Sequence, residues 1–150
     1  MQEYNAIQTH LRELYDSQHL AVLATEDRGH PYANLVAFAV GDDLRKFYFA
    51  TNRGTRKFSN IQSNSQVALL IDNRANSVGD FSHAVAVTVR GDCRELSGME
   101  KVEAACRYVK KHPHLEEFVS SPGCAFMEIV VRSLNLVSRF QNVTEYDFAP

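Results

Sequence analysis

Residues 48–57 read YFATNRGTRK, a run in which a strand leads directly into the start of a helix. The aromatic and β-forming residues end in a turn, and a helix is predicted to begin near Thr55. Arg53, Arg56 and Lys57 surround the N-terminus of that helix, whose partial positive charge disfavours each cation by about 0.3–1 kcal/mol. A bound anion would reverse this effect, because free backbone N–H groups at a helix N-terminus bind phosphate. The plainer alternative is that the cations are solvated and Thr55 is only an N-cap.

Apolar residues elsewhere in the chain recur mostly at the two-residue spacing of β-strands. Strands are predicted at residues 19–26, 31–40, 46–51, 66–72, 84–96, 124–133 and 134–140. Helices are predicted at residues 2–17, within 54–64, and after a capping box at 97–100, the last with an apolar stripe of Val102, Ala105, Cys106 and Val109. The polar residues 141–150 show no clear period.

Six or seven strands joined mostly by short turns, with three helices around them, predict an antiparallel β-barrel with peripheral helices. A chain of 150 residues is long enough to bury one core, so residues 1–150 are expected to form a single domain. A doubly wound parallel sheet is not favoured, and the sequence contains no Gly-x-Gly-x-x-Gly motif.

Composition excludes several classes of function. A formal net charge of −2 gives no electrostatic basis for binding nucleic acid, and no apolar run approaches the roughly 20 residues of a membrane helix. The N-terminus lacks the basic start and apolar stretch of a signal peptide, so a cytoplasmic location is predicted. The three cysteines are expected to be reduced thiols, mostly buried, and His112 and His114 to be surface residues. No metal site is predicted, because none of these residues has the spacing of a ligand set.

Residues 31–73 read PYANLVAFAVGDDLRKFYFATNRGTRKFSNIQSNSQVALLIDN and resemble the core of the pyridoxamine 5'-phosphate oxidase-like family of FMN-binding split barrels. The family pattern is a strand ending in aromatic-aromatic-x-Thr, a Gly-Ser/Thr-Arg-Lys helix start, an Asn, and a Val-x-Leu-Leu strand. Here these elements are residues 47–51, residues 54–57, Asn60 and residues 67–70. The resemblance covers somewhat more than half of the chain.

The resemblance implies a homodimer of six- or seven-stranded split barrels with FMN as the cofactor between the two subunits. Arg56 and Lys57 would bind the FMN phosphate, and His83 would contribute across the interface. The remaining cofactor-binding residues would be the phosphate-side Ala50, Thr51, Asn52 and Thr55, and the ring-lining Asn34, Leu35 and Val36.

The function implied is that of an FMN-dependent oxidoreductase acting on an unidentified small-molecule substrate. The alternatives are a non-catalytic flavin-binding electron carrier and a relative that binds haem or a deazaflavin. Vitamin B6 oxidase activity itself is not expected, because the chain has no Trp and its C-terminus lacks the Arg-rich substrate segment of those enzymes.

Overall fold

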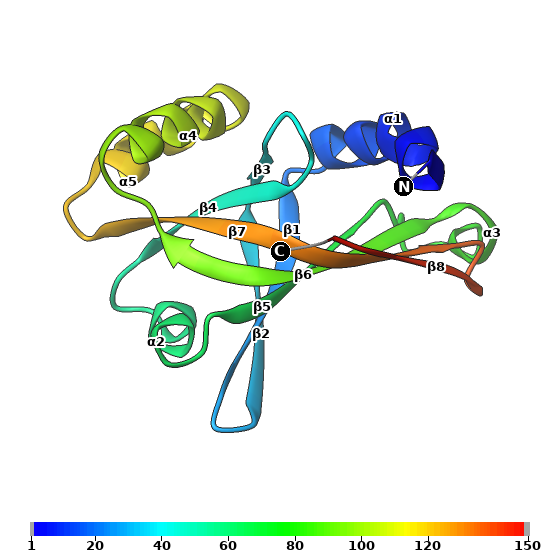
Figure 1. Cartoon of the computed structure of the whole chain (residues 1–150), viewed down its shortest axis with the longest axis horizontal. Helices are drawn as coiled ribbons and strands as arrows, with labels where there is room; N and C mark the ends of the chain where they lie inside the picture. Colours follow the sequence, from blue (N-terminus) through cyan, green and yellow to red (C-terminus); the bar gives the residue numbers. More distant parts are fainter. Residues whose placement is uncertain (1, 149–150) are drawn as a thin grey trace.

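One antiparallel sheet of eight strands forms the centre of the molecule (Figure 1). The computed structural model describes residues 2–148. The strands are β1 (Leu20–Asp27), β2 (His30–Ala37), β3 (Ala39–Val40), β4 (Lys46–Asn52), β5 (Gln66–Asp72), β6 (Val85–Glu95), β7 (Cys124–Ser138) and β8 (Asn142–Asp147). Their order in the sheet is β2-β1-β5-β6-β7-β4-β3, and β8 pairs with β7. This arrangement confirms the predicted antiparallel β-barrel class with peripheral helices.

Five α-helices surround the sheet. They are α1 (Gln2–Ser17), α2 (Arg56–Ser63), α3 (Asp80–His83), α4 (Gly98–Lys111) and α5 (Glu116–Ser120), with a 3₁₀ turn at Pro113–Leu115. In Figure 1, α1 and α4 lie on one side of the sheet, and α2 lies on the opposite side beside the projecting β1–β2 hairpin. No helix within residues 2–148 is long and apolar enough to cross a membrane.

The core lies inside the curved sheet, where alternate residues of each strand point inward. Buried side chains from five strands meet there, among them Leu23, Phe49, Leu69, Val89 and Met127. Helix α1 covers one end, and its Tyr15 ring packs edge-on against Phe47 with 5.0 Å between the ring centroids. Each fully buried side chain of this size stabilises the fold by about 1.5–3 kcal/mol, so α1 is an integral part of the domain.

The C-terminal strands differ from their predicted form. Residues 124–138 form one strand of 15 residues, not two, because β7 pairs with β4, β6 and β8 along its length. Residues 142–147, which have no clear period, form β8 on the edge of β7. An edge strand with one solvent-facing side does not need strict apolar alternation, so its pattern in the sequence is weak.

The buried face of helix α4 matches the predicted apolar stripe only in part: Ala105 and Val109 are partly buried against the core, as predicted. Its buried residues are Ala104 and Tyr108, whereas Val102 is 61% exposed and Cys106 is exposed. The Tyr108 ring packs edge-on against Phe126 of β7, and this large aromatic contact determines the orientation of the helix. Ser97 is the N-cap residue but makes no side-chain capping hydrogen bond, so the predicted capping box is not formed.

His112 was predicted to be a surface residue, and that prediction is wrong. Its side chain is 1% exposed, and Nε2 lies 2.8 Å from the carbonyl oxygen of Phe38. Because a carbonyl can only accept, Nε2 carries the proton and the ring is held as one tautomer. Burial is the main reason that the pKa of His112 is lowered. The thiols are free, with Cys93 and Cys124 buried.

Candidate binding site at the start of helix α2

A network of hydroxyl and amide groups fixes the loop between β4 and α2. Thr51 is 1% exposed, and its Oγ1 lies 2.9 Å from Oγ1 of Thr55. The Thr55 hydroxyl donates to the carbonyl of Asn52 at 2.9 Å and accepts the backbone N–H of Phe58 at 3.3 Å. Asn52 Oδ1 accepts the backbone N–H of Gly54 at 2.8 Å. Thr55 is thus the N-cap of α2, and these hydrogen bonds connect the loop to the first turn of the helix.

Two backbone donors remain available at this helix N-terminus. The N–H groups of the first helical residues have no intrahelical acceptor, and the cap hydroxyl satisfies only that of Phe58. Within residues 2–148, the N–H groups of Arg56 and Lys57 have no acceptor. They therefore form the kind of donor pair that binds a phosphate group.

The three cations near this terminus do not act together. Arg53 turns away and forms a two-point ion pair with Glu95, with Nη1 2.8 Å from Oε1. This pairing lowers the pKa of the Glu95 carboxyl. Arg53 is therefore neutralised by an acid 42 positions along the chain, and the predicted cluster of three cations is reduced to two.

Unlike Arg53, neither Arg56 nor Lys57 makes an ion pair with any residue that the structure describes. Lys57 is partly buried, and burial lowers the pKa of its amine. The guanidinium of Arg56 lies over the Tyr32 ring, with Cζ 5.7 Å from the ring centroid. Two cations without carboxylate partners, next to two free backbone donors, form a site suited to an anion.

Strand β2 lies opposite Arg56 on one side of this helix start. A pocket of about 160 Å³ lies between the β1–β2 hairpin and α2, lined by Asp27, His30, Pro31, Tyr32, Arg56 and Asn60. The Asn60 side chain is buried and donates from Nδ2 to Oγ1 of Thr25 at 3.0 Å, which joins α2 to β1. This volume suits a phosphate group, whereas whole ligands of drug size fill roughly 300–1,000 Å³.

Asn34 of β2 has an unsatisfied acceptor. Its Oδ1 is buried and has no hydrogen-bond partner among the described residues. Side chains of alternate residues share a face of a strand, so Asn34 lies on the same face as Tyr32, one step further from the hairpin tip. An unpaired buried acceptor costs about 1–3 kcal/mol, which makes Asn34 a candidate contact for a ligand.

The backbone of β2 is also available for binding. Among residues 2–148, the edge strand β2 pairs only with β1, and Phe38 N–H donates to His19 C=O at the end of that pairing. Because antiparallel pairing alternates, the N–H and C=O groups of residues 33, 35 and 37 face the open edge. Leu35 is 61% exposed beside these groups, whereas Val36 is buried in the core. Of the predicted residues Leu35 and Val36, Leu35 can therefore reach a ring along this edge through its backbone, whereas the buried Val36 side chain cannot.

Within one chain, His83 lies far from the other predicted cofactor-binding residues. It ends α3, with Nδ1 3.1 Å from the carbonyl oxygen of Gly79, and α3 and α2 lie at opposite ends of the molecule (Figure 1). A role for His83 therefore stays a prediction that requires a second copy of the chain.

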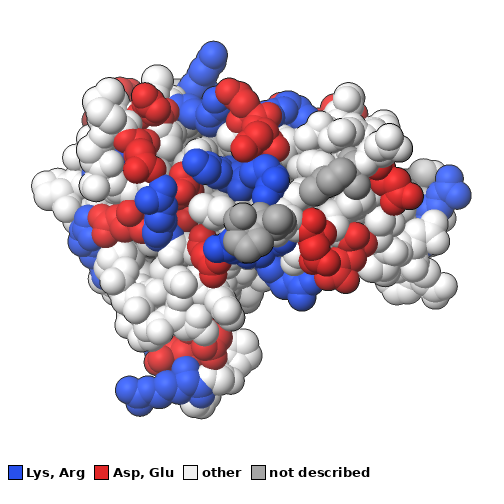
Figure 2. Space-filling view, viewed as in Figure 1, with Lys and Arg blue, Asp and Glu red and all other residues white. Residues whose placement is uncertain are grey.

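Sequence reasoning missed a larger hollow on the other face of β1, β5 and β6. Its volume is about 660 Å³, and it shares Pro31 with the smaller pocket. Its charged residues already have polar partners: Arg132 donates to Asp92 at 2.6 Å, Arg90 donates to Glu145 at 2.7 Å, and Glu26 accepts from the Asn64 side chain and the Gly29 N–H. Paired charges leave this hollow without an evident site for a charged ligand. The face shown in Figure 2 likewise has cationic and anionic side chains interspersed.

Most of the chain matches a known protein family. The family model for pyridoxamine 5'-phosphate oxidase matches residues 7–138. A comparison with curated protein sequences finds no match.

Several solved structures have a similar fold. A heme-binding protein from Mycobacterium smegmatis has a TM-score of 0.81 at 13% identity, covering 91% of this chain and 55% of that chain. A FAD-binding protein from Mesorhizobium loti has a TM-score of 0.68 at 17% identity, covering 85% and 90%. The heme storage protein HutZ from Vibrio cholerae has a TM-score of 0.70 at 12% identity, covering 84% and 95%. This chain thus spans about half of the first of these proteins, and the likeness establishes a shared fold.

Proposed function

The chain belongs to the pyridoxamine 5'-phosphate oxidase family, and from this premise we propose that it is an FMN-dependent oxidoreductase of a small-molecule substrate. One observation carries the proposal: Arg56 and Lys57 lack carboxylate partners beside two free N–H groups at the start of α2. Each charge-assisted hydrogen bond to a phosphate contributes about 1.5–3 kcal/mol. FMN supplies a phosphate for this site and a ring for the edge of β2.

The residues of this chain bind and orient the cofactor. Arg56, Lys57 and the N-terminus of α2 hold the phosphate, and the Thr51–Thr55 contact connects β4 to this helix start. The backbone N–H and C=O of Leu35 can donate a hydrogen bond to a flat ring system and accept one from it, and the unsatisfied Oδ1 of Asn34 can accept one. When bound, FMN supplies the hydride- or electron-transfer chemistry.

A homodimer is part of the proposal. The pocket beside Arg56 has room for the phosphate but leaves a flavin ring exposed along β2. Leu20 and Leu35 expose 51% and 61% of their surface on the outer face of β1 and β2. A second copy of the chain packed against this face would cover both the ring and these apolar side chains. His83 of that second copy is then available to contact the flavin.

Two single substitutions, each of which removes one positive charge, provide a test of the phosphate site. Arg56→Ala removes an unpaired cation at the start of α2, whereas Arg53→Ala removes one that is paired with Glu95. In a titration that follows the quenching of FMN fluorescence, we expect Arg56→Ala to raise the Kd by roughly 10- to 150-fold. Arg53→Ala is expected to change it only a few-fold. Equal losses in the two variants, with unchanged circular dichroism, would contradict the proposed site.

A catalytic role is separate from flavin binding and needs its own assay. Consumption of NAD(P)H by the FMN-loaded protein, with a panel of acceptors, should exceed that of free FMN. Flavin binding without such turnover would favour the electron carrier over the oxidoreductase.

Haem is the second candidate ligand, because two of the structural neighbours bind or store it. The same pair of cations would also suit the two propionates of a haem. Flavin and haem absorb at distinguishable wavelengths, so the visible spectrum of the protein after mixing with each ligand separates the two. A haem spectrum that survives dilution and excess FMN would replace the flavin proposal.

A further inference from the structure

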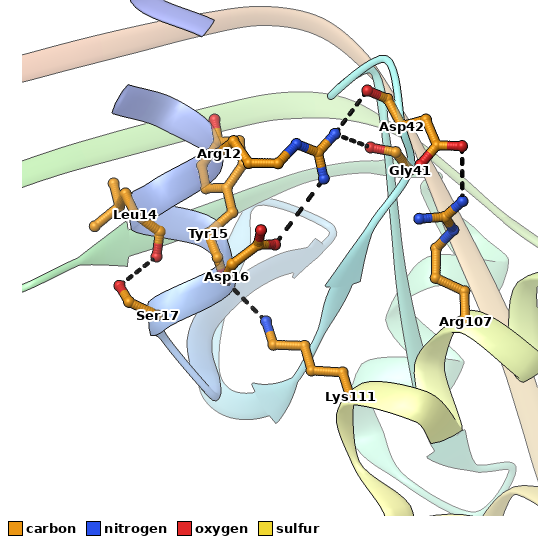
Figure 3. A network of polar contacts seen from close by, with 9 residues as sticks. All are labelled: Arg12, Leu14, Tyr15, Asp16, Ser17, Gly41, Asp42, Arg107 and Lys111. Carbon is orange, nitrogen blue, oxygen red and sulfur yellow. Dashed lines mark hydrogen bonds and ion pairs between the residues drawn. The ribbon is translucent and has the colours of Figure 1, made fainter. Parts of the chain in front are cut away.

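A second basic hollow lies between α1 and α4, on the side of the sheet away from α2. We call it the α1–α4 groove; its volume is about 300 Å³, and the two small residues at its floor belong to β3. It is lined by Arg12, Asp16, Ala39, Val40, Arg107, Lys110 and Lys111. Figure 3 shows Arg12, Arg107 and Lys111 around the space between the two helices and the β3–β4 turn.

Two of these cations are held by neutral groups. Arg12 Nη2 donates to the carbonyl oxygens of Gly41 at 3.1 Å and Asp42 at 2.6 Å. Lys111 Nζ donates to the carbonyl oxygen of Tyr15 at 2.9 Å (Figure 3). It also lies 3.9 Å from the centroid of the Phe38 ring. Carbonyls and rings orient a cation without cancelling its formal charge, so the groove keeps much of its positive potential.

Carboxylates compensate only part of this charge. Arg107 Nη2 lies 2.9 Å from Oδ2 of Asp42, and Asp16 lies at the longer distance of 4.0 Å from Arg12. Lys110 makes no ion pair within residues 2–148. Four cations face two carboxylates, which leaves a surplus of two positive charges in a chain whose net charge is −2. Burial also lowers the pKa of Lys111 to about 8, which shows that its charge is poorly solvated.

We propose that the α1–α4 groove binds a phosphate dianion, either free or as the monoester of a small organic molecule, at a site separate from the one at α2. A dianion matches the surplus of two charges, and fork-shaped guanidinium groups suit phosphate oxygens. The small floor residues Ala39 and Val40 leave room for an apolar portion of the ligand. Because the cations come from α1 and α4, a bound phosphate holds the two helices together.

The test measures binding of inorganic phosphate by isothermal titration calorimetry at constant ionic strength. An Arg56→Ala/Lys57→Ala background removes the cations at α2, so the remaining binding reports on the groove. In this background we compare Lys110→Glu with Lys101→Glu, which has the same charge change nine residues away on α4. A rise of 1.5 Å per residue places the two positions about 13.5 Å apart along the helix axis.

We expect Lys110→Glu to weaken phosphate binding at least tenfold and Lys101→Glu to leave it nearly unchanged. Phosphate should also raise the melting temperature of the background variant and of Lys101→Glu, but not that of Lys110→Glu. A phenyl phosphate titration then shows whether a monoester binds more tightly than the free anion. Equal binding by the two charge-reversal variants, or no binding in the background variant, would overturn the proposal. Neither result bears on FMN binding at α2.

Discussion

Asn34→Leu separates the stability of the free protein from its capacity to bind flavin. In the structure, Asn34 Oδ1 is buried without a hydrogen-bond partner among residues 2–148. Leucine has nearly the same shape but no polar atoms, so it removes an unsatisfied acceptor from β2. If the acceptor is reserved for a ligand, the substitution stabilises the protein without ligand and weakens ligand binding.

The expected changes in stability and in FMN affinity follow from the free energies of single hydrogen bonds. An unsatisfied buried acceptor costs about 1–3 kcal/mol, of which we expect about 1 kcal/mol to be recovered at this partly buried position. For a domain of this length, that gain raises the melting temperature of the flavin-free protein by about 2–4 °C. Loss of one neutral hydrogen bond, worth about 0.5–1.5 kcal/mol, should raise the Kd for FMN by roughly 2- to 12-fold.

The matched control is Asn135→Leu, because the Oδ1 of Asn135 accepts a hydrogen bond from Arg90 at 3.2 Å. The same substitution there removes a hydrogen bond that is already formed, so it should not raise the melting temperature and should leave FMN affinity unchanged. Differential scanning fluorimetry and FMN titration on both variants provide the data. A destabilised Asn34→Leu protein with normal FMN affinity would refute the assignment of Asn34 to the site.

Three further substitutions test the fold. A Cβ at Gly91 would lie 2.2 Å from the carbonyl oxygen of Val130, so Gly91→Ala should cost at least about 1–3 kcal/mol in urea unfolding. Gly123→Ala, where the nearest atom is 3.7 Å away, should cost much less, and equal costs would contradict the packing at β6. His112 has a folded-state pKa below its ordinary 6.5, so the unfolded chain binds more protons and stability falls as the pH drops below about 6.5. His112→Gln, which keeps a donor for Phe38 but does not titrate, should lose less unfolding free energy between pH 7 and pH 5, and an unchanged loss would exclude His112 as its cause.

The start of α2 was predictable because its determinants are local. Thr55 caps the helix three residues before Phe58, and Arg56 and Lys57 follow directly, so residues 48–57 contain most of the geometry. The pairing of Arg53 with Glu95 spans 42 positions and depends on how β6 is placed in the sheet. No short-range pattern indicates that pairing, and the prediction therefore counted one cation too many.

The sequence pattern could not resolve which face of α4 is buried, because this depends on tertiary packing. Val102 and Tyr108 are both apolar enough to face a core, and the contact of Tyr108 with Phe126 selected the buried side. The proposed role of Asn34 had only the family resemblance as a signal, because an unpaired acceptor is visible only once the neighbours in space are known.

The most direct test of the account compares FMN with riboflavin, which has the same ring system but no phosphate. Two charge-assisted contacts of about 1.5–3 kcal/mol each predict that the protein binds FMN roughly 10²- to 10⁴-fold more tightly than riboflavin. In Arg56→Ala/Lys57→Ala, this preference should largely disappear while riboflavin affinity is unchanged. Equal affinity of the unmodified protein for the two flavins, or a preference that persists in the double variant, would contradict a phosphate site at the start of α2.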